Sequence, residues 1–358
     1  MREHDDLLDY ALRHQFGDIH YRVDPKTGMR AIIAVHNTKL GPALGGCRFI
    51  EYDNSVAATL DAMRLARGMS FKSAVAGLPL GGGKAVIMKP KTSFDRDAYF
   101  HAFGRFVNDL QGQYITAMDS GTELSDMAII AQHTPYVASL AKDDGDPARA
   151  TALGTLRGIQ AAVAFQKKQD HLEDLVVAIQ GLGHVGYLLA KHLHDLGAKL
   201  IVADVNQARV EQAVTEFGAR AVSSTDIHQV PCDVFSPNAL GAVLNEITIP
   251  QLQASIIAGA ANNQLAHYEF GQILHDKHIL FAPDYVINAG GVIFACSKYY
   301  QTDPAETEKS LNRIGDSLTN IFIRSQEDNK PPSDIADMIA EEIIASKHET
   351  PESLATTA

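Results

Sequence analysis

Two lysines, Lys72 and Lys84, stand at either end of a small, apolar stretch that finishes in Gly81-Gly82-Gly83. Three consecutive glycines let the backbone approach another group closely, at a cost in chain entropy that an ordinary surface loop avoids. Two ammonium groups held close together in a dry pocket disfavour each other's protonation. One lysine could then act as a general base while the other holds a carboxylate. Two solvated lysines that flank a flexible loop are the alternative, and this stretch alone gives both interpretations equal weight.

A carboxylate stands where a predicted strand ends. Asp119 closes the apolar run that starts at Tyr114, and Ser120-Gly121-Thr122 follows it. An acid beside a glycine at a strand end is a common position for a working carboxylate. It is also a common helix cap. Taken alone, the local sequence favours the cap.

A glycine-rich turn, Gly181-Leu182-Gly183-His184-Val185-Gly186, follows the apolar run 175–180 and opens a predicted helix. Asp204 ends the next apolar run, at the spacing that a dinucleotide-binding unit requires. Gly181 would make the tight turn, Gly183 would admit the pyrophosphate, and Gly186 would let the helix pack on the strand. The N–H groups at the start of the helix would meet the phosphate charge.

The carboxylate of Asp204 predicts which dinucleotide is used. It would accept hydrogen bonds from the hydroxyls of the adenosine ribose, and it would repel a 2′-phosphate. No arginine follows it directly, and Arg209 is more simply a residue of the next helix. We therefore expect NAD rather than NADP.

Asparagines follow two later apolar runs, at Asn262-Asn263 and at Asn288. In open parallel sheets, ligands bind beyond the carboxyl ends of the strands. These amides are therefore candidate contacts to the nicotinamide, its ribose or a substrate. Turn residues that make local backbone hydrogen bonds explain them equally well.

The elements that must position these residues fall into two halves, and the polar turn 143–147 is the best candidate boundary. The first half predicts a hairpin, further short strands and several amphipathic helices, at 1–16, 19–23, 29–35, 47–52, 55–67, 84–88, 96–110 and 114–119. The second half alternates strands with helices, which describes a doubly wound parallel sheet, at 153–166, 175–180, 187–196, 200–204, 207–217, 233–236, 255–259, 268–277 and 279–282. The chain then reads as helices, from 292, at 306–324 and at 335–346.

The bulk composition limits the class of protein. A chain of 358 residues suggests about two domains. A formal net charge of -12 argues against a broad surface for nucleic acid or an anionic membrane. No apolar run is long enough to cross a bilayer, and the first residues are too acidic for a secretory signal. Three widely spaced cysteines and scattered histidines predict neither disulfides nor a metal site, so we expect reduced thiols and a cytoplasmic protein.

These motifs, in this order, resemble the family of glutamate, leucine, phenylalanine and valine dehydrogenases, and most of all its leucine-specific members. The matching segments cover most of the chain: 41–48, 65–72, 77–87, 116–122, 151–154, 181–186, 236–244, 257–265 and 282–293. The resemblance implies an N-terminal α/β catalytic domain at 1–140 and a Rossmann-type NAD domain at 141–330. Residues 331–358 would return to the first domain, and the cleft between the domains would close over the substrate. It also implies a homo-oligomer.

The resemblance further implies the reaction and the residues that perform it. Such enzymes reversibly deaminate an L-amino acid to a 2-oxo acid and ammonia, with hydride transfer to NAD. Lys84 would be the base that activates water, and Asp119 would hold the amino group and relay protons. Lys72 would bind the substrate carboxylate with the backbone of Gly45 and Gly46. Asn288 would contact the substrate, and the nicotinamide end would meet Thr151 and Asn262.

Substrate choice would depend on an apolar pocket formed by Leu44, Ala117, Val292 and Ala295. A leucine at position 44 would leave the side-chain carboxylate of glutamate desolvated and unpaired. We expect L-leucine to be preferred, with valine or phenylalanine as alternatives, because one methylene changes discrimination by only about 1–3 kcal/mol. A catalytically silent, nucleotide-sensing relative is a further alternative, but Lys72, Lys84 and Asp119 are intact. A hydroxy-acid dehydrogenase would need a histidine–carboxylate pair that the sequence does not place.

Overall fold

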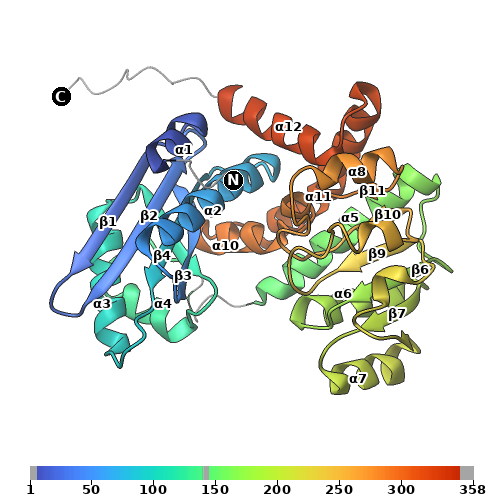
Figure 1. The fold of residues 1–358 in the computed structure, drawn as a ribbon, viewed down its shortest axis with the longest axis horizontal. Helices are drawn as coiled ribbons and strands as arrows, with labels where there is room; N and C mark the ends of the chain where they lie inside the picture. Colours follow the sequence, from blue (N-terminus) through green and yellow to red (C-terminus); the bar gives the residue numbers. More distant parts are fainter. Residues whose placement is uncertain (1–5, 139, 141–144, 347–358) are drawn as a thin grey trace. The chain divides into compact units, whose positions relative to one another are not determined.

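The computed structural model describes residues 6–138, 140 and 145–346, and it divides into two compact units (Figure 1). The first unit comprises the described residues of Met1–Asp144, Lys298–Gln301 and Ala340–Ala358. The second comprises Gly145–Ser297 and Thr302–Ile339. Parts of the predicted helix 1–16 and of the predicted boundary 143–147 lie outside the described residues. The assignment of substrate and cofactor to the two halves stays a prediction.

A five-stranded mixed sheet forms the centre of the first unit, with the strand order β1-β2-β4-β3-β5. Its strands are β1 (Asp18–Asp24), β2 (Met29–Asn37), β3 (Ala43–Ile50), β4 (Gly81–Met88) and β5 (Tyr114–Met118). The predicted hairpin is confirmed, because β1 and β2 pair antiparallel along their whole length. Strand β3 runs parallel to both of its neighbours, β4 and β5.

The three consecutive glycines lie inside β4, and every residue of that strand is buried. The flexible-loop interpretation of this stretch is therefore wrong. The close approach expected of the glycines is confirmed, since a Cβ at Gly82 would lie 2.0 Å from the backbone nitrogen of Ser70. The group that approaches β4 is thus a helix of the same unit.

That helix, α2 (Ser55–Val75), continues well beyond the predicted end at Arg67 and carries Lys72 in its last turn. Its N-cap is Asn54, whose side chain accepts a hydrogen bond from the N–H of Ala57. The other helices of this unit are α1 (Leu7–Arg13), α3 (Arg96–Asp109) and α4 (Leu124–Ile130).

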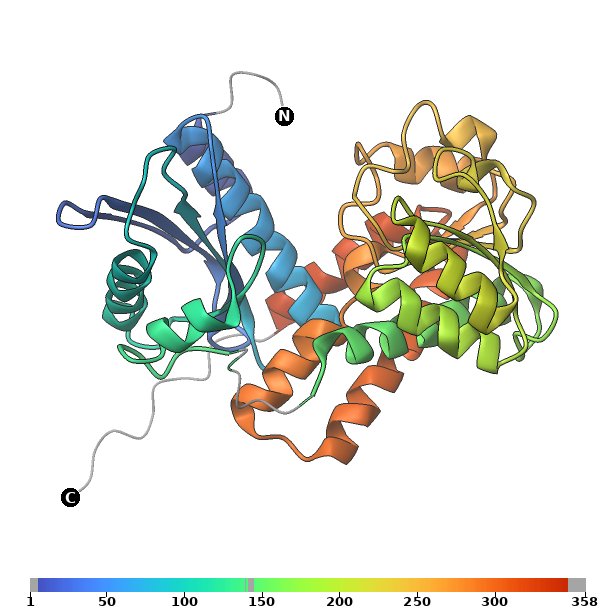
Figure 2. The same ribbon diagram turned by 90° about the horizontal axis from the view of Figure 1, so that it is seen from below.

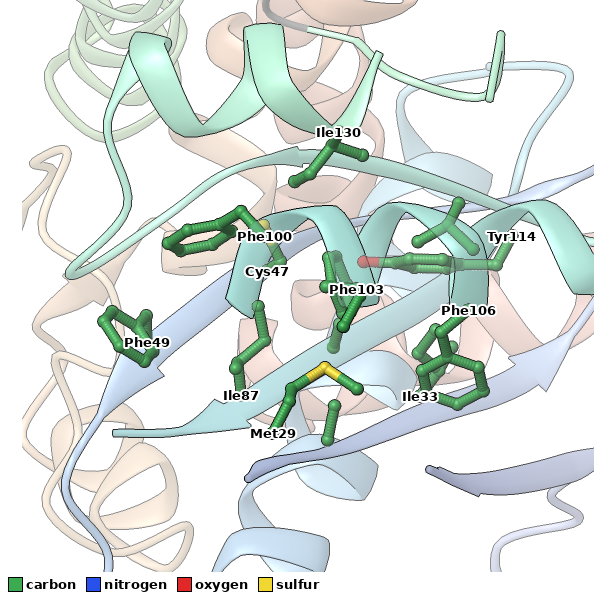
Figure 3. Close-up of a cluster of buried hydrophobic side chains, with 14 of the residues drawn as sticks. Met29, Ile33, Cys47, Phe49, Ile87, Phe100, Phe103, Phe106, Tyr114 and Ile130 are labelled. Atoms are coloured by element: carbon green, nitrogen blue, oxygen red, sulfur yellow. The ribbon is translucent and has the colours of Figure 1, made fainter. Parts of the chain in front are cut away.

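Alternate residues of the strands supply two separate cores, one on each face of the sheet. Figure 3 shows part of the larger core, in which Ile33, Phe49 and Ile87 of the strands pack against aromatic residues that include Phe100 and Phe103 of α3. On the opposite face, strand residues of the other parity pack against α2, among them Ile32, Ala34, Val86, Ala62 and Met63. Residues 84, 86 and 88 of β4 therefore face the helix that carries Lys72.

The second unit contains a six-stranded sheet with the order β11-β10-β9-β6-β7-β8, in which every pairing is parallel. The strands are β6 (Val176–Gln180), β7 (Lys199–Ala203), β8 (Arg220–Ala221), β9 (Val234–Pro237), β10 (Ile256–Ile257) and β11 (Leu280–Phe281). Figure 2 shows the sheet of this unit together with its helices. The predicted doubly wound parallel sheet is confirmed, and the two-residue strand β8 is an addition to it.

Helices cover both faces of this sheet, as parallel strands require. This unit contains α5 (Pro147–Lys167), α6 (His184–Asp195), α7 (Gln207–Phe217), α8 (Phe270–Asp276), α9 (Asp284–Ile287) and α11 (Pro304–Asp328), together with the first parts of α10 (Gly290–Tyr300) and α12 (Pro332–Ser346), whose last residues belong to the first unit. Phe270 and Leu274 of α8 pack against Ala178 and Phe235 of the strands on one face, while α6 contacts β6 and β7. None of the helices in the described residues is long and apolar enough to cross a membrane.

Candidate active site

Lys84 and Asp119 form an ion pair on the face of the first sheet that α2 covers. Lys84 lies in β4 and is 7% exposed, whereas Asp119 follows the last residue of β5 directly. Strand β3 lies between these two strands, and its register pairs Gly46 with Ala117 of β5. A Cβ at Gly46 would lie only 2.7 Å from the Cβ of Asp119. The missing side chain in the middle strand therefore lets the ammonium group and the carboxylate meet across it.

The turn after β5 fixes the backbone of Asp119. Thr122 accepts a hydrogen bond from the N–H of Asp119 at its Oγ1 (2.9 Å), and Gly121 has a φ of +82° in close contact with the carbonyl of Phe49. The N-cap of α4 is Glu123. The helix-cap alternative for Asp119 is thus wrong, and its side chain is available at the strand end.

Opposing effects act on the Asp119 carboxyl group. Burial raises its pKa, but the ammonium group of Lys84, the N–H of Ser120 and the guanidinium of Arg48 together hold the pKa below its ordinary value. The carboxylate is therefore ionised at neutral pH. Burial also raises the pKa of the neighbouring Cys47 thiol to about 12, so this thiol adds no charge.

The remaining predicted substrate positions of this unit lie on the same strands and on α2. Leu44 is 2% exposed and Ala117 is 7% exposed, while Gly45 lies so close to β4 that a Cβ would meet the carbonyl of Gly83. Lys72 is half-buried in the last turn of α2. Lys84 Nζ pairs with the Asp119 carboxylate. The spacing of Lys72 and Lys84 had suggested two neighbouring ammonium groups, and it did not indicate this carboxylate.

The glycine-rich turn in the second unit has three distinct environments. Gly181 has a φ of +93°, and a Cβ there would lie 2.8 Å from that of Ala239. A Cβ at Gly186 would lie 2.0 Å from the carbonyl oxygen of Gly181, so this glycine lets α6 pack on the turn. Gly183 is the N-cap of α6, and a Cβ there would meet nothing within 4 Å. The open position is the one where a pyrophosphate would approach the first N–H groups of the helix.

Asp204, at the end of β7, lies against this turn. Its Oδ2 accepts a hydrogen bond from the N–H of Leu182 at 2.6 Å, and its Oδ1 accepts one from Asn206 at 2.7 Å. His184 and Val185 open α6, and His184 Nε2 pairs with Asp146 Oδ2 at 3.0 Å. The structure therefore brings the acid and the turn together, as a dinucleotide-binding unit requires.

Three more predicted cofactor and substrate residues gather at the start of α10. Asn288 is 6% exposed and donates from Nδ2 to Asn262 Oδ1 at 2.7 Å and to the carbonyl of Ala260 at 3.1 Å. Its Oδ1 is buried and has no hydrogen-bond partner among the described residues. Thr151 packs against the first turn of α10, where a Cβ at Gly290 would lie 2.7 Å from the Cα of Thr151. A buried amide oxygen without a partner fits the approach of a ligand donor such as a carboxamide or an amine.

Two family models match the chain. One, described as the dimerisation domain of Glu/Leu/Phe/Val dehydrogenase, covers residues 14–136. The other, described as Glutamate/Leucine/Phenylalanine/Valine dehydrogenase, covers residues 201–350. The chain belongs to the Glu/Leu/Phe/Val dehydrogenase family. It is therefore an amino-acid dehydrogenase, an oxidoreductase class that depends on a pyridine nucleotide.

Individual members of this family align over almost their whole length. A leucine dehydrogenase from Geobacillus stearothermophilus is 47% identical over 342 residues, which is 95% of this chain and 93% of the relative. An L-tryptophan dehydrogenase from Nostoc punctiforme is 45% identical over 319 residues, with 88% and 90% of the two chains covered. The crystal structure of L-tryptophan dehydrogenase from the same organism matches with a TM-score of 0.87, 41% identity, and coverage of 95% and 99%.

The family's predicted functional residues are distributed over both units. Lys72, Lys84, Asp119, Leu44, Gly45, Gly46 and Ala117 lie in the first unit, and the dinucleotide turn, Asp204, Thr151, Asn262, Asn288, Val292 and Ala295 lie in the second. Within the second unit, Val292 is 9% exposed and Ala295 is half-buried, both on α10. The combination of the two sets into one site is part of the function proposed below.

Arg48 also lies beside the Lys84–Asp119 pair, with its Nε 3.6 Å from Asp119 Oδ2, and the sequence did not single it out. The alternation of side chains along a strand could have indicated its position, because residues 46 and 48 of β3 face the same side as Lys84. No cluster of three or more histidine, cysteine or acidic side chains suited to a metal ion occurs in the described residues. All three cysteines are free thiols; Cys47 and Cys296 are buried and Cys232 is partly exposed.

Proposed function

We propose that this protein catalyses the NAD-dependent, reversible oxidative deamination of an apolar L-amino acid, with L-leucine preferred. The amino acid, NAD⁺ and water give the 2-oxo acid, ammonium, NADH and a proton. The observation that carries the proposal is the buried ion pair of Lys84 and Asp119, in a chain that belongs to an amino-acid dehydrogenase family.

The residues of the first unit would bind the substrate and move protons. Lys72 would hold the substrate carboxylate with the backbone of Gly45 and Gly46. Asp119 would take a proton from the ammonium group of the substrate, and Lys84 would take a proton from the water that attacks the imine carbon. Asp119 would then return its proton to the departing nitrogen. General acid–base catalysis of this kind contributes roughly 10²–10⁴ in rate.

The residues of the second unit would hold the dinucleotide, which accepts a hydride from the α-carbon when it is bound. The pyrophosphate would lie at the open position beside Gly183, on the N–H groups that begin α6. Thr151 and Asn262 would contact the nicotinamide end, and Asn288 the substrate. Asp204 would bind the ribose hydroxyls and disfavour a 2′-phosphate, so we propose NAD as the cofactor.

The pocket residues support an apolar substrate. Leu44, Ala117, Val292 and Ala295 carry no charge that could pair with a carboxylate on a substrate side chain. The cost of an unpaired carboxylate therefore disfavours glutamate. The relatives named above are a leucine dehydrogenase and an L-tryptophan dehydrogenase. The side chains of these two amino acids differ widely in size, so the pocket must choose among apolar side chains of different sizes. We propose leucine because the leucine dehydrogenase matches with the higher identity and coverage.

The test is a panel of L-amino acids, assayed by the appearance of NADH at alkaline pH. We expect the highest kcat/KM with L-leucine and no turnover with L-glutamate. Lys84→Ala should lower kcat by about 10²–10⁴-fold and leave NADH binding unchanged. Lys89→Ala is the matched control, since Lys89 is an exposed residue directly after the same strand. Full activity in Lys84→Ala would contradict the assignment of the base.

A further inference from the structure

Arg48 lies next to the Lys84–Asp119 pair, on the same strand and face as Gly46. Its Nε is 3.6 Å from Asp119 Oδ2, with only 22% and 20% of the two side chains exposed. Among the described residues, this Nε is a buried donor without a hydrogen-bond acceptor. The distance is too long for a hydrogen bond, so the contact is electrostatic. The same oxygen of Asp119, Oδ2, thus has two cations near it, Lys84 and Arg48.

A second carboxylate holds Arg48 in this place. Asp61, on α2, accepts at Oδ2 a hydrogen bond from Arg48 Nη1 at 2.8 Å. The same oxygen accepts a hydrogen bond from the phenol of Tyr52 at 2.5 Å. Burial, together with the hydrogen bond to Asp61, raises the pKa of Tyr52, so the phenol keeps the proton that it donates. Because a guanidinium does not lose its proton in proteins, the positive charge of Arg48 is permanent.

The charges of this group balance. Two cations and two carboxylates alternate from Asp61 to Arg48, Asp119 and Lys84. The sheet and the helix around Asp119 contribute several titratable side chains, namely Lys84 of β4, Arg48 and Cys47 of β3, Tyr114 of β5, and Asp61 of α2. Burial keeps the pKa of both Cys47 and Tyr114 far above neutral, so neither adds charge. Removal of Arg48 would leave the group with an excess of negative charge.

We propose that Arg48, anchored by Asp61 and Tyr52, is a positioning residue that fixes the charge and the orientation of the Asp119 carboxylate toward Lys84. The inference rests on the proposed function, because it assigns Arg48 a task in the same reaction. Arg48 itself touches neither the reacting atoms nor the dinucleotide in this role. Its cation helps to hold the pKa of the Asp119 carboxyl group below its ordinary value.

The pH dependence of turnover distinguishes this role from a merely structural one. In Arg48→Gln, the loss of a neighbouring positive charge should move the acidic limb of the kcat/KM profile upward by about one pH unit. We expect kcat to fall by about 10-fold or more, a part of the general acid–base contribution, while the dissociation constant of NADH stays the same. Arg48→Lys should return the acidic limb of the kcat/KM profile to its wild-type position, since the positive charge is restored. Its kcat should recover only partly, because an ammonium group cannot reproduce the geometry by which the guanidinium binds Asp61.

Arg22→Gln is the matched control. Arg22 also pairs with an aspartate at 2.8 Å in the first unit, but its partner is Asp109 and both side chains lie on the surface. This variant should keep the pH profile of the wild type. If Arg48→Gln does not fold, Arg48→Met, which also removes the charge but keeps an unbranched side chain, should move the same limb in the same direction. An unchanged profile in folded Arg48→Gln or Arg48→Met would overturn the proposal.

A second readout needs no turnover. The melting temperatures of Arg48→Gln, Asp119→Asn and the double variant form a double-mutant cycle. We expect the two losses to be non-additive, because each variant removes the same contact. An inactive wild type on the amino-acid panel would defeat the proposed function and leave this cycle intact as a test of the contact. An active wild type with additive melting shifts and unmoved pH limbs would defeat only the inference.

Discussion

The position of a single glycine decides whether the central ion pair can form. Neighbouring strands lie about 4.8 Å apart, so Lys84 of β4 must reach over the whole width of β3 to meet Asp119 beyond β5. Any side chain at position 46 would occupy that path, because its Cβ would lie 2.7 Å from that of Asp119. Gly46 takes no part in the proposed reaction, but it sets the geometry of Lys84 and Asp119, the two residues that we propose to be catalytic.

Asp204 is the residue on which dinucleotide choice depends. Its carboxylate lies against the turn through the N–H of Leu182 at 2.6 Å, in the place where a 2′-phosphate would add negative charge. Asp204→Ser should lower kcat/KM for NAD and raise it for NADP, which changes the preference by roughly 10–100-fold, or about 1.4–2.8 kcal/mol.

The measurement is kcat/KM with each dinucleotide at saturating amino acid. Asp195→Ser is the control, since Asp195 is an exposed residue at the end of α6 that pairs with Lys191. An unchanged preference in Asp204→Ser would show that other residues select the cofactor.

At the scale of the elements, the glycines Gly82 and Gly183 contribute in different ways, one to packing and the other to ligand binding. Gly82 lets α2 pack against β4, since a Cβ would lie 2.0 Å from the nitrogen of Ser70. Gly183 has open space at the start of α6. Gly82→Ala should therefore lower the free energy of unfolding by about 1–3 kcal/mol or more through overpacking. Gly183→Ala should leave stability nearly unchanged and weaken NADH binding by about 10-fold, because its methyl group would stand where the pyrophosphate approaches.

Urea unfolding and NADH fluorescence titration of both variants separate the two effects. Each variant serves as the control of the other. A stability loss in Gly183→Ala with normal NADH affinity would contradict the role of the open position.

Local patterns predicted most of these elements, and the failures have a physical cause. Helix α7 begins and ends where its apolar period predicted, and the hairpin of β1 and β2 follows from alternation and turn chemistry. The predicted helix 55–67 stopped too early, because Gly68 and Ser70 are weak helix formers. In the folded chain, the packing of this segment against β4 outweighs that weak propensity. The two-residue strand β8 is too short to leave any period.

In the candidate site, too, some residues could be predicted from local patterns and others could not. The glycine-rich turn and its acid form a local pattern, so their arrangement could be predicted from spacing. The partners of Lys84 could not, since Asp119, Arg48 and Asp61 come from different elements and meet only through the register of three strands and the packing of α2. The argument from the spacing of the two lysines considered only their mutual repulsion, and Asp119 entered the site through the family resemblance.

At the scale of the whole molecule, the outer edge of strand β1 has no neighbouring strand in the described part of the chain. Strand β1 is the last strand on one side of its sheet, and an unpaired edge is a template for association with another chain. Tyr21 and Val23 on this strand are 55% and 65% exposed. The family model that covers β1 is described as a dimerisation domain. We therefore propose that the protein is a homo-oligomer, and that β1 belongs to an interface between copies.

Light scattering of the purified protein should give a mass that is a multiple of the 38.7 kDa chain. Val23→Lys should shift this mass toward the monomer, since a charge would then have to be buried at the interface. Ile247→Lys is the matched control, because Ile247 is equally exposed at 65% but lies on the second unit. We expect its mass to equal that of the wild type. A monomeric wild type would refute the assembly, and an unchanged oligomer in Val23→Lys would place the interface elsewhere than β1.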